Sequence, residues 1–277
     1  MNIRPTEGSV RSADGTSIGY IKLGSGPGLV VVHGSLTKGD EWLPASSALA
    51  NRFTCYLLDR RGRGRSGDSV EYSLSKECED IKAVLDVAGS EPSLLGHSYG
   101  AICALEAANR FAVSKLVLYE PPLPIHETVI GQAFEDFRAA VDRNEFDEAL
   151  VIALRDLVKM AHEDVAGLRR SPHWSGMAAL TPTWTRECEE VKQLDFGVAR
   201  FAGVTSPTLL LVGTATARHH IEASLALERT LPNVRSVQLQ NQGHQAHLTA
   251  TAEFVGAIED FLGEPLRHEG SASSSQL

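Results

Sequence analysis

The sequence is poor in features that would direct it to an oxidising compartment or into a membrane. Its four cysteines are scattered over 277 residues with no C-x-x-C spacing, so we expect reduced thiols rather than a disulfide framework. No apolar run approaches the ~20 residues that a membrane-spanning helix needs. The opening segment MNIRPTEGSVRSADG is polar and does not resemble a signal peptide, so we expect a cytoplasmic protein.

The sequence also has fewer positive charges than negative ones. Lysine and arginine number 26 against 35 aspartates and glutamates, which gives a net charge of −9 at pH 7. An acidic surface repels phosphate groups, so neither nucleic acid nor an anionic membrane is expected as a partner. The partner that remains is a small-molecule substrate, and the sequence allows a homodimer. A hydrophobic fraction of 43% provides an ordinary core.

Short apolar runs alternate with helical patterns along most of the chain. We expect strands at residues 29–32, 53–59, 93–98, 115–120, 207–213 and 234–240, preceded by a hairpin around Asp14-Gly15. Between them, stretches such as SLSKECEDIKAVLDVAG carry apolar residues at helical spacing. Such alternation predicts an α/β fold, with a doubly wound, mostly parallel sheet.

The alternation stops at the prolines PPLP and resumes near residue 207. The segment between them contains helical patterns and no convincing strand. We therefore expect residues 1–120 and 207–265 to form the sheet domain, and residues 121–206 to form a helical cap inserted over it. Trp174, Met177 and Trp184 are expected to line a pocket in the cap or to pack it. The polar tail 266–277 is expected to be disordered.

The stretch LLGHSYG places Ser98 where a predicted strand meets a predicted helix. Gly96 and Gly100 flank it at two residues on either side. A turn sharp enough to expose the serine crowds both flanking positions, where a Cβ would clash. The N–H of Tyr99 then opens the helix and can stabilise an oxyanion.

A serine nucleophile needs a base, and ten histidines are available. His244 follows Gly243 in the loop after the last predicted strand, and in open α/β sheets that edge holds the chemistry. His244 is therefore the first candidate for the base, and His247 is the second. His33 and His97 end strands and are expected to be scaffold groups. The remaining histidines are expected at the surface: His126, His162, His173, His219, His220 and His268.

The loop after the first central strand reads HGSL. Its Ser35 is the candidate for a second oxyanion donor, through its backbone N–H and with its hydroxyl as a further donor. The alternative is that His33-Gly34 forms only a structural turn and this loop supplies no oxyanion donor.

Five features together resemble the α/β-hydrolase fold superfamily. They are HG after a buried strand, RGRGRSG after the next strand, GHSYG, a helical insertion, and NQGH near the end. The likeness runs from about residue 9 to residue 262. It implies a nucleophile at Ser98, a base at His244, oxyanion amides at Ser35 and Tyr99, and a cap over the pocket.

One feature departs from that pattern. The superfamily usually carries its acid just after the strand that corresponds to TLLLVG, but the loop here reads GTATARHH and contains no Asp or Glu. Glu222, the nearest acid, lies well inside the next helix. Some members of the superfamily supply the acid from the strand that corresponds to KLVLYE, so Glu120 is the candidate here. The alternatives are that Glu120 anchors the cap, or that activity is weakened.

The leading hypothesis is a cofactor-free serine hydrolase that cleaves an ester, thioester or lactone. The same fold could carry out C–C bond hydrolysis or lyase- or oxygenase-type chemistry, and a binding protein with a degraded triad is the third hypothesis. GRGRSG matches G-x-G-x-x-G in letters, but no helix follows it directly, so a loop with arginines paired to Asp59 and Asp68 is the favoured interpretation. No spacing of histidines, cysteines and acids indicates a metal site.

Overall fold

The structure is a computed structural model that describes residues 4–265. The tail 266–277, predicted to be disordered, lies outside the described residues. None of the helices in residues 4–265 is both long enough and apolar enough to cross a membrane.

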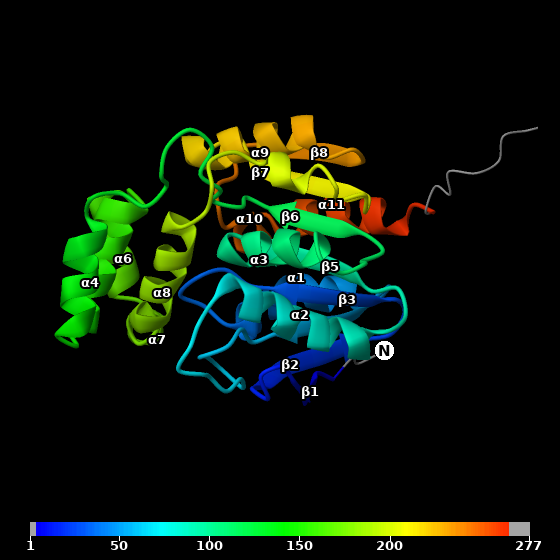
Figure 1. Ribbon diagram of the computed structural model, residues 1–277, viewed down its shortest axis with the longest axis horizontal. Coiled ribbons are helices and arrows are strands. Elements are labelled where there is room, and N and C mark those ends of the chain that lie inside the picture. Colours follow the sequence, from blue (N-terminus) through cyan, green and yellow to red (C-terminus); the bar gives the residue numbers. More distant parts are fainter. Residues whose placement is uncertain (1–3, 266–277) are drawn as a thin grey trace, which may run out of the picture.

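Eight strands form one sheet in the order β1-β2-β4-β3-β5-β6-β7-β8 (Figure 1). Strands β3 to β8 run parallel to one another, whereas β2 is antiparallel to both β1 and β4. The predicted mostly parallel sheet and its opening hairpin are therefore confirmed. The strands are β1 Thr6–Arg11, β2 Ser17–Gly24, β3 Gly28–Val32, β4 Thr54–Leu58, β5 Ser93–His97, β6 Leu116–Tyr119, β7 Thr208–Gly213 and β8 Val234–Leu239.

Helices cover both faces of the sheet, which is why its central strands β3 to β7 are buried at every position. Val30 and Val32 of β3 pack with α2, α3 and α9, while Leu29 and Val31 of the same strand pack with α1 and α11 on the other face. The helices of the sheet domain are η1 Gly39–Trp42, α1 Leu43–Leu49, α2 Leu74–Ala88, α3 Tyr99–Ala108, α9 Arg218–Thr230, α10 Ala246–Thr249 and α11 Thr251–Gly263.

All regular elements between β6 and β7 are helices. The first of these helices lie beyond one end of the sheet (Figure 1). It has apolar clusters of its own, one of which contains Trp174, Met177 and Trp184, so these side chains pack the helices together. The elements are α4 Phe134–Asp142, α5 Phe146–Ile152, η2 Ala153–Leu157, α6 His162–Arg169, α7 Trp174–Ala178, α8 Thr181–Lys192 and η3 Ala199–Phe201.

The turn between β5 and α3 brings three backbone segments close together. A Cβ at Gly96 would clash with the carbonyl oxygen of Gly100, and a Cβ at Gly100 would clash with the carbonyl oxygens of Val32 and His33. The clashing atoms are backbone atoms of α3, of β3 and of the residue after β3, so they cannot move aside as a flexible side chain would. Both glycines are therefore required by close approach, as the sequence predicts.

Gly100→Ala should lower the free energy of unfolding by about 1–3 kcal/mol, because the added methyl group overpacks the β3–β5 junction. Urea unfolding followed by circular dichroism measures the change. Gly256→Ala in α11 is the matched control, since a Cβ there meets nothing within 4 Å; it should leave stability unchanged or raise it by about 0.5–1 kcal/mol. Equal stability of the two variants would contradict this account of the turn.

Candidate active site

Ser98 occupies the turn between β5 and α3 with φ 55° and ψ −128°, a conformation that residues with a side chain rarely adopt. Such backbone costs about 1–3 kcal/mol and persists where the surrounding structure enforces it. Here the Ser98 N–H donates to the carbonyl of Tyr119 at 2.9 Å, which fixes the turn to the neighbouring strand β6. The strain and the half-buried position are those of a side chain presented for reaction.

Glu120 directly follows β6, also with a positive φ of 50°, and its side chain is fully buried. Its Oε2 lies 2.6 Å from Nδ1 of His244 and accepts a 2.8 Å hydrogen bond from the Thr216 hydroxyl. Its Oε1 accepts a 2.8 Å hydrogen bond from the N–H of Gly213. All three partners belong to the sheet domain, so these contacts give no support to Glu120 as a cap anchor.

His244 lies in the loop after β8, with its side chain 30% exposed. Because Nδ1 faces the Glu120 carboxylate, Nε2 is the ring nitrogen that is a candidate for the base. The loop is held on both sides of this residue. Tyr119 donates its hydroxyl to the carbonyl of Gly243 and accepts from the N–H of Ala246, and Nε2 of His97 lies 2.9 Å from the carbonyl oxygen of His244. His97, the residue before Ser98, is thus a scaffold group, as predicted.

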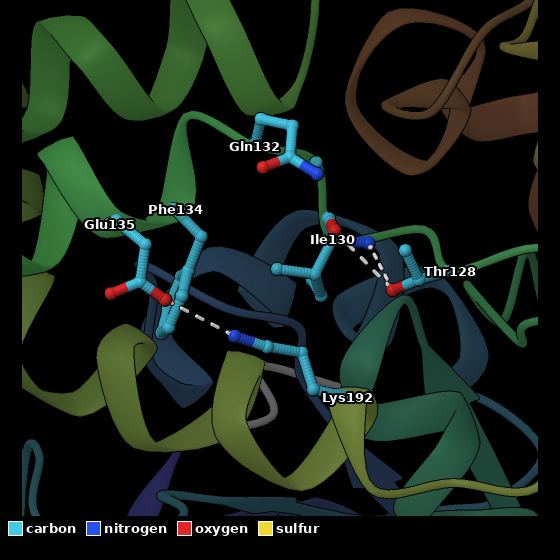
Figure 2. A pocket seen from close by; sticks show the side chains of 7 residues that line it. Thr128, Ile130, Gln132, Phe134, Glu135 and Lys192 are labelled. Carbon is cyan, nitrogen blue, oxygen red and sulfur yellow. Dashed lines mark hydrogen bonds and ion pairs between the residues drawn. The ribbon is translucent and has the colours of Figure 1, made fainter.

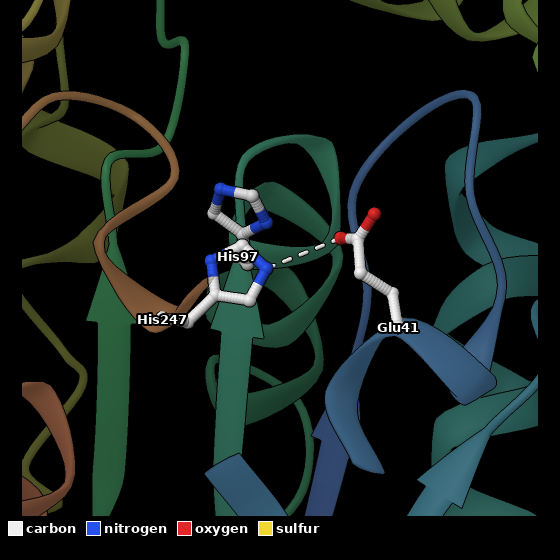
Figure 3. A group of neighbouring side chains, drawn as sticks. All are labelled: Glu41, His97 and His247. Carbon is white, nitrogen blue, oxygen red and sulfur yellow. Dashed lines mark hydrogen bonds and ion pairs between the residues drawn. The ribbon is translucent and has the colours of Figure 1, made fainter. Parts of the chain in front are cut away.

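His247 is placed differently from His244. Its side chain is fully buried, its ring stacks on Trp42 at 4.5 Å, and its Nε2 lies 3.2 Å from a carboxylate oxygen of Glu41 (Figure 3). Both nitrogens are thereby removed from the position of a free base: Nε2 faces Glu41, and Nδ1 is buried without a partner. Of the two candidate bases, only His244 contacts a buried carboxylate at the edge that carries Ser98.

Two sets of donor atoms approach one another closely enough to hold a metal ion, which sequence spacing does not indicate. The atoms of Glu41, His97 and His247 lie within 4.8 Å of one another, as do those of Glu120, His220 and His244. Two imidazoles and a carboxylate are donors that suit Zn²⁺. In the second set the rings of His220 and His244 are stacked face to face, so their in-plane lone pairs do not converge.

The loop after β3 lies against Ser98, the candidate nucleophile. A Cβ at Gly34 would stand 3.0 Å from the Cβ of Ser98. Tyr99 is the first residue of α3, so its N–H has no partner within the helix. The Ser35 hydroxyl donates to Glu187 at 2.5 Å. That contact corrects the expectation that the hydroxyl is a further oxyanion donor and leaves the backbone N–H of Ser35 as the candidate.

Four buried charged side chains lie behind this loop. Arg60 contacts Glu77 at 2.8 Å and Glu187 at 2.7 Å, and Arg63 also contacts Glu187. Burial tends to raise the pKa of Glu187, but the two guanidinium groups outweigh it and hold this pKa below its usual range. Because Glu187 belongs to α8, the cluster joins the inserted helices to the sheet domain.

The other two arginines of this region are also held by carboxylates. Arg65 pairs with Asp59 at 3.0 Å, as predicted, and Arg61 makes two 2.7 Å hydrogen bonds to Asp80. The predicted pairing with Asp68 is wrong, because Asp68 contacts Arg186 of α8 at 2.9 Å. His33 is also a scaffold group: Nδ1 lies 2.7 Å from the carbonyl oxygen of Gly34. Burial, followed by the charge of Arg60, lowers the pKa of His33 well below its ordinary value.

His220 corrects a prediction. It is expected at the surface, yet only 6% of the residue is exposed, and its ring stacks on that of His244. The pattern TARHH offers one signal, since it marks the first turn of α9, beside the end of β7. Sequence reasoning also misses Thr216, which supplies a hydroxyl to Glu120 from the loop where an acid is expected.

A cavity of about 230 Å³ lies between the start of α4 and the end of α8 (Figure 2). Lys192 pairs with Glu135 at its edge, at 3.3 Å. Neither this cavity nor a second one of about 250 Å³ beside α6 is lined by Ser98, Glu120 or His244. The chemistry-bearing residues therefore meet at the sheet edge and not in the hollows of the inserted helices.

Comparison with known proteins points to one family. Residues 29–257 match the family described as the alpha/beta hydrolase family. The chain is 27% identical over 274 residues to an N-formylmaleamate deformylase from Pseudomonas putida, covering 92% of this chain and 96% of that protein. It is 25% identical to a pimeloyl-[acyl-carrier protein] methyl ester esterase from Aeromonas hydrophila, covering 89% of this chain and all of that protein.

A solved structure agrees with these relatives. The crystal structure of an alpha/beta hydrolase from Sphaerobacter thermophilus superposes with a TM-score of 0.84 at 31% identity, covering 92% of this chain and 100% of the other. The resemblance inferred from HG, GHSYG and NQGH is therefore confirmed. With a family match over most of its length and the expected sheet around a strained serine, this chain belongs to the alpha/beta hydrolase family and is a hydrolase.

Proposed function

We propose that this protein cleaves a carboxylic ester, thioester or lactone of a small molecule through an acyl-enzyme on Ser98, without a cofactor. The observation that carries the proposal is the 2.6 Å contact between the Glu120 carboxylate and Nδ1 of His244, at the sheet edge where Ser98 is held at φ 55°. A base oriented by a buried acid, beside a strained serine, is the arrangement of a nucleophile–base–acid triad.

In the proposed first half-reaction, Nε2 of His244 takes the Ser98 proton while the serine oxygen attacks the substrate carbonyl carbon. The carbonyl oxygen becomes an oxyanion that accepts hydrogen bonds from the N–H groups of Ser35 and Tyr99. His244 then returns the proton to the leaving alcohol or thiol as its bond to carbon breaks. The products of this half-reaction are the acyl ester of Ser98 and a neutral leaving group.

In the second half-reaction, His244 takes a proton from water, and the resulting hydroxide equivalent attacks the acyl carbon. The same two N–H groups hold the second oxyanion, each worth about 3 kcal/mol of transition-state stabilisation. Collapse breaks the bond to Ser98, which recovers its proton from His244. Glu120 keeps the proton of His244 on Nδ1 and stabilises the imidazolium formed in both halves.

The relatives support acyl chemistry of this kind. One is named as a methyl ester esterase and another as a deformylase, and both names describe hydrolytic removal of a group from an acyl carbon. Addition to a carbonyl and collapse of an oxyanion need the same serine, base and pair of N–H donors in either case. We therefore place oxygen esters first and formyl amides second as substrate classes for this chain.

The alternative of a binding protein with a degraded triad rests on the missing acid after β7. The contact of His244 with the buried carboxylate of Glu120, at the end of the neighbouring strand β6, supports an intact triad and weighs against that alternative. C–C bond hydrolysis and lyase- or oxygenase-type chemistry remain the second enzymatic candidates, because the same fold supports them.

Ser98→Ala should abolish turnover of p-nitrophenyl acetate, because no other oxygen is placed to form the acyl-enzyme. Stopped-flow absorbance measures turnover, and a fluorophosphonate probe followed by peptide mass spectrometry should label Ser98 in the wild type only. Ser175→Ala, an exposed serine in α7, is the control and should react as the wild type does. Unchanged ester turnover by Ser98→Ala would refute the acyl-enzyme.

Glu120→Gln should lower kcat by about 10³–10⁴-fold with a much smaller change in KM, because an amide nitrogen favours the wrong tautomer of His244. Steady-state kinetics on the same ester measure the loss. Glu222→Gln is the matched control, since Glu222 is the nearest acid after β7 and pairs only with Arg218 at 2.6 Å. A normal rate for Glu120→Gln with a slow Glu222→Gln would assign the acid to α9 instead.

A further inference from the structure

A second histidine lies against the face of the proposed base and takes no part in the mechanism above. The ring centres of His220 and His244 are 4.3 Å apart, and the two planes differ by 13°. His220 stands in the first turn of α9, buried to within 6% of its surface. The small separation and angle are those of stacked rings, so the two rings restrict each other.

The backbone around this contact is fixed. The loop between β7 and α9 is tied to the loop that carries His244, because Ala215 donates its N–H to the carbonyl of Gln242 at 2.9 Å. The hydroxyl of Thr214 accepts a 2.8 Å hydrogen bond from Asn241 in the same way. Helix α9 begins at Arg218, directly after this joined segment, so His220 and His244 are held by one connected piece of structure.

The geometry excludes a proton relay between the two rings. Imidazole N–H bonds and lone pairs lie in the ring plane, whereas these rings meet through their faces. Nδ1 of His220 is buried and has no hydrogen-bond partner, so the residue is not buried to satisfy that atom. What His220 offers to its neighbour is an aromatic face.

The charge state of His220 suits this role. His244 carries a positive charge in each half of the proposed reaction, and a second cation stacked on it would oppose that step. Burial lowers the pKa of His220 well below its ordinary value, and the charges of His244 and His219 act in the same direction. These effects outweigh a hydrogen bond to the backbone of Glu120, which raises this pKa. The ring of His219 packs beside that of His220, with 4.0 Å between ring centres. The Glu120 carboxylate contacts His244, the ring that stacks on His220. His220 is therefore a neutral ring when His244 is charged.

We propose that His220 is a positioning residue that holds the His244 ring plane while that ring takes and returns the proton. The inference rests on the proposed function. The χ2 torsion of a histidine is broad, and the hydrogen bond from Nδ1 to Glu120 fixes only one side of the ring. A flat, uncharged neighbour restricts the remaining rotation and lets the π face stabilise the imidazolium.

The test compares variants that keep or remove the aromatic face. His220→Phe should retain kcat for p-nitrophenyl acetate within threefold of the wild type. His220→Ala should lose at least tenfold in kcat with KM within twofold, and should slow fluorophosphonate labelling of Ser98 to the same degree. Arg218→Ala, two residues earlier and largely exposed, is the control and should match the wild type.

Thermal unfolding of each variant separates positioning from folding. A folded His220→Ala with a wild-type rate would overturn the inference, and so would a His220→Phe that falls as far as His220→Ala. If His220→Ala does not fold, His220→Gln takes its place, because it keeps side-chain bulk without an aromatic face. If the probe does not label Ser98 in the wild type, the proposed function and this inference are both overturned. If the labelling rate is the same in all folded variants, the inference alone is overturned.

Discussion

The buried carboxylate of Glu120 sets the arrangement of the whole sheet edge. Glu120 lies at the end of β6, and its carboxylate contacts the loop after β8. Because β7 lies between these two strands, the side chain extends past the end of β7. A fully buried carboxylate costs several kcal/mol unless hydrogen bonds replace its water. The end of β7 provides those hydrogen bonds through Gly213 and Thr216. The position of the acid therefore determines what the β7 loop must contain.

This constraint explains why GTATARHH lacks an acid. A second carboxylate in that loop would stand beside Glu120 and repel it, whereas an N–H and a hydroxyl stabilise it. The end of β7 also lies very close to the His244 loop, because a Cβ at Gly213 would clash with the carbonyl of Gln242. The loop is thus a small, donor-rich support, and helix α9 starts near enough for His220 to reach the base.

The sequence was sufficient for features that depend on local pattern. Alternating apolar and helical segments give the parallel sheet, and Gly96 and Gly100 around Ser98 identify the turn because backbone crowding there admits no side chain. Features that depend on distant partners were not predictable in the same way. Glu187 lies 152 positions from Ser35 along the chain, and the stretch TRECEEVK does not show which of its three glutamates is buried against that partner. His220 is hidden for a related reason, since TARHH marks a helix start beside the sheet edge but does not show that one of its two rings is buried.

Glu187 links the inserted helices to the chemistry through charge. It binds Ser35 directly, and it binds Arg60, whose guanidinium lies 4.6 Å from the ring centre of Tyr99. Both residues proposed to hold the oxyanion are therefore in contact with one buried set of two arginines and two glutamates, which is neutral as a whole. Removing any member would leave an uncompensated buried charge, at a cost of about 3–5 kcal/mol. The inserted segment is thus tied, through Glu187, to both residues proposed to hold the oxyanion.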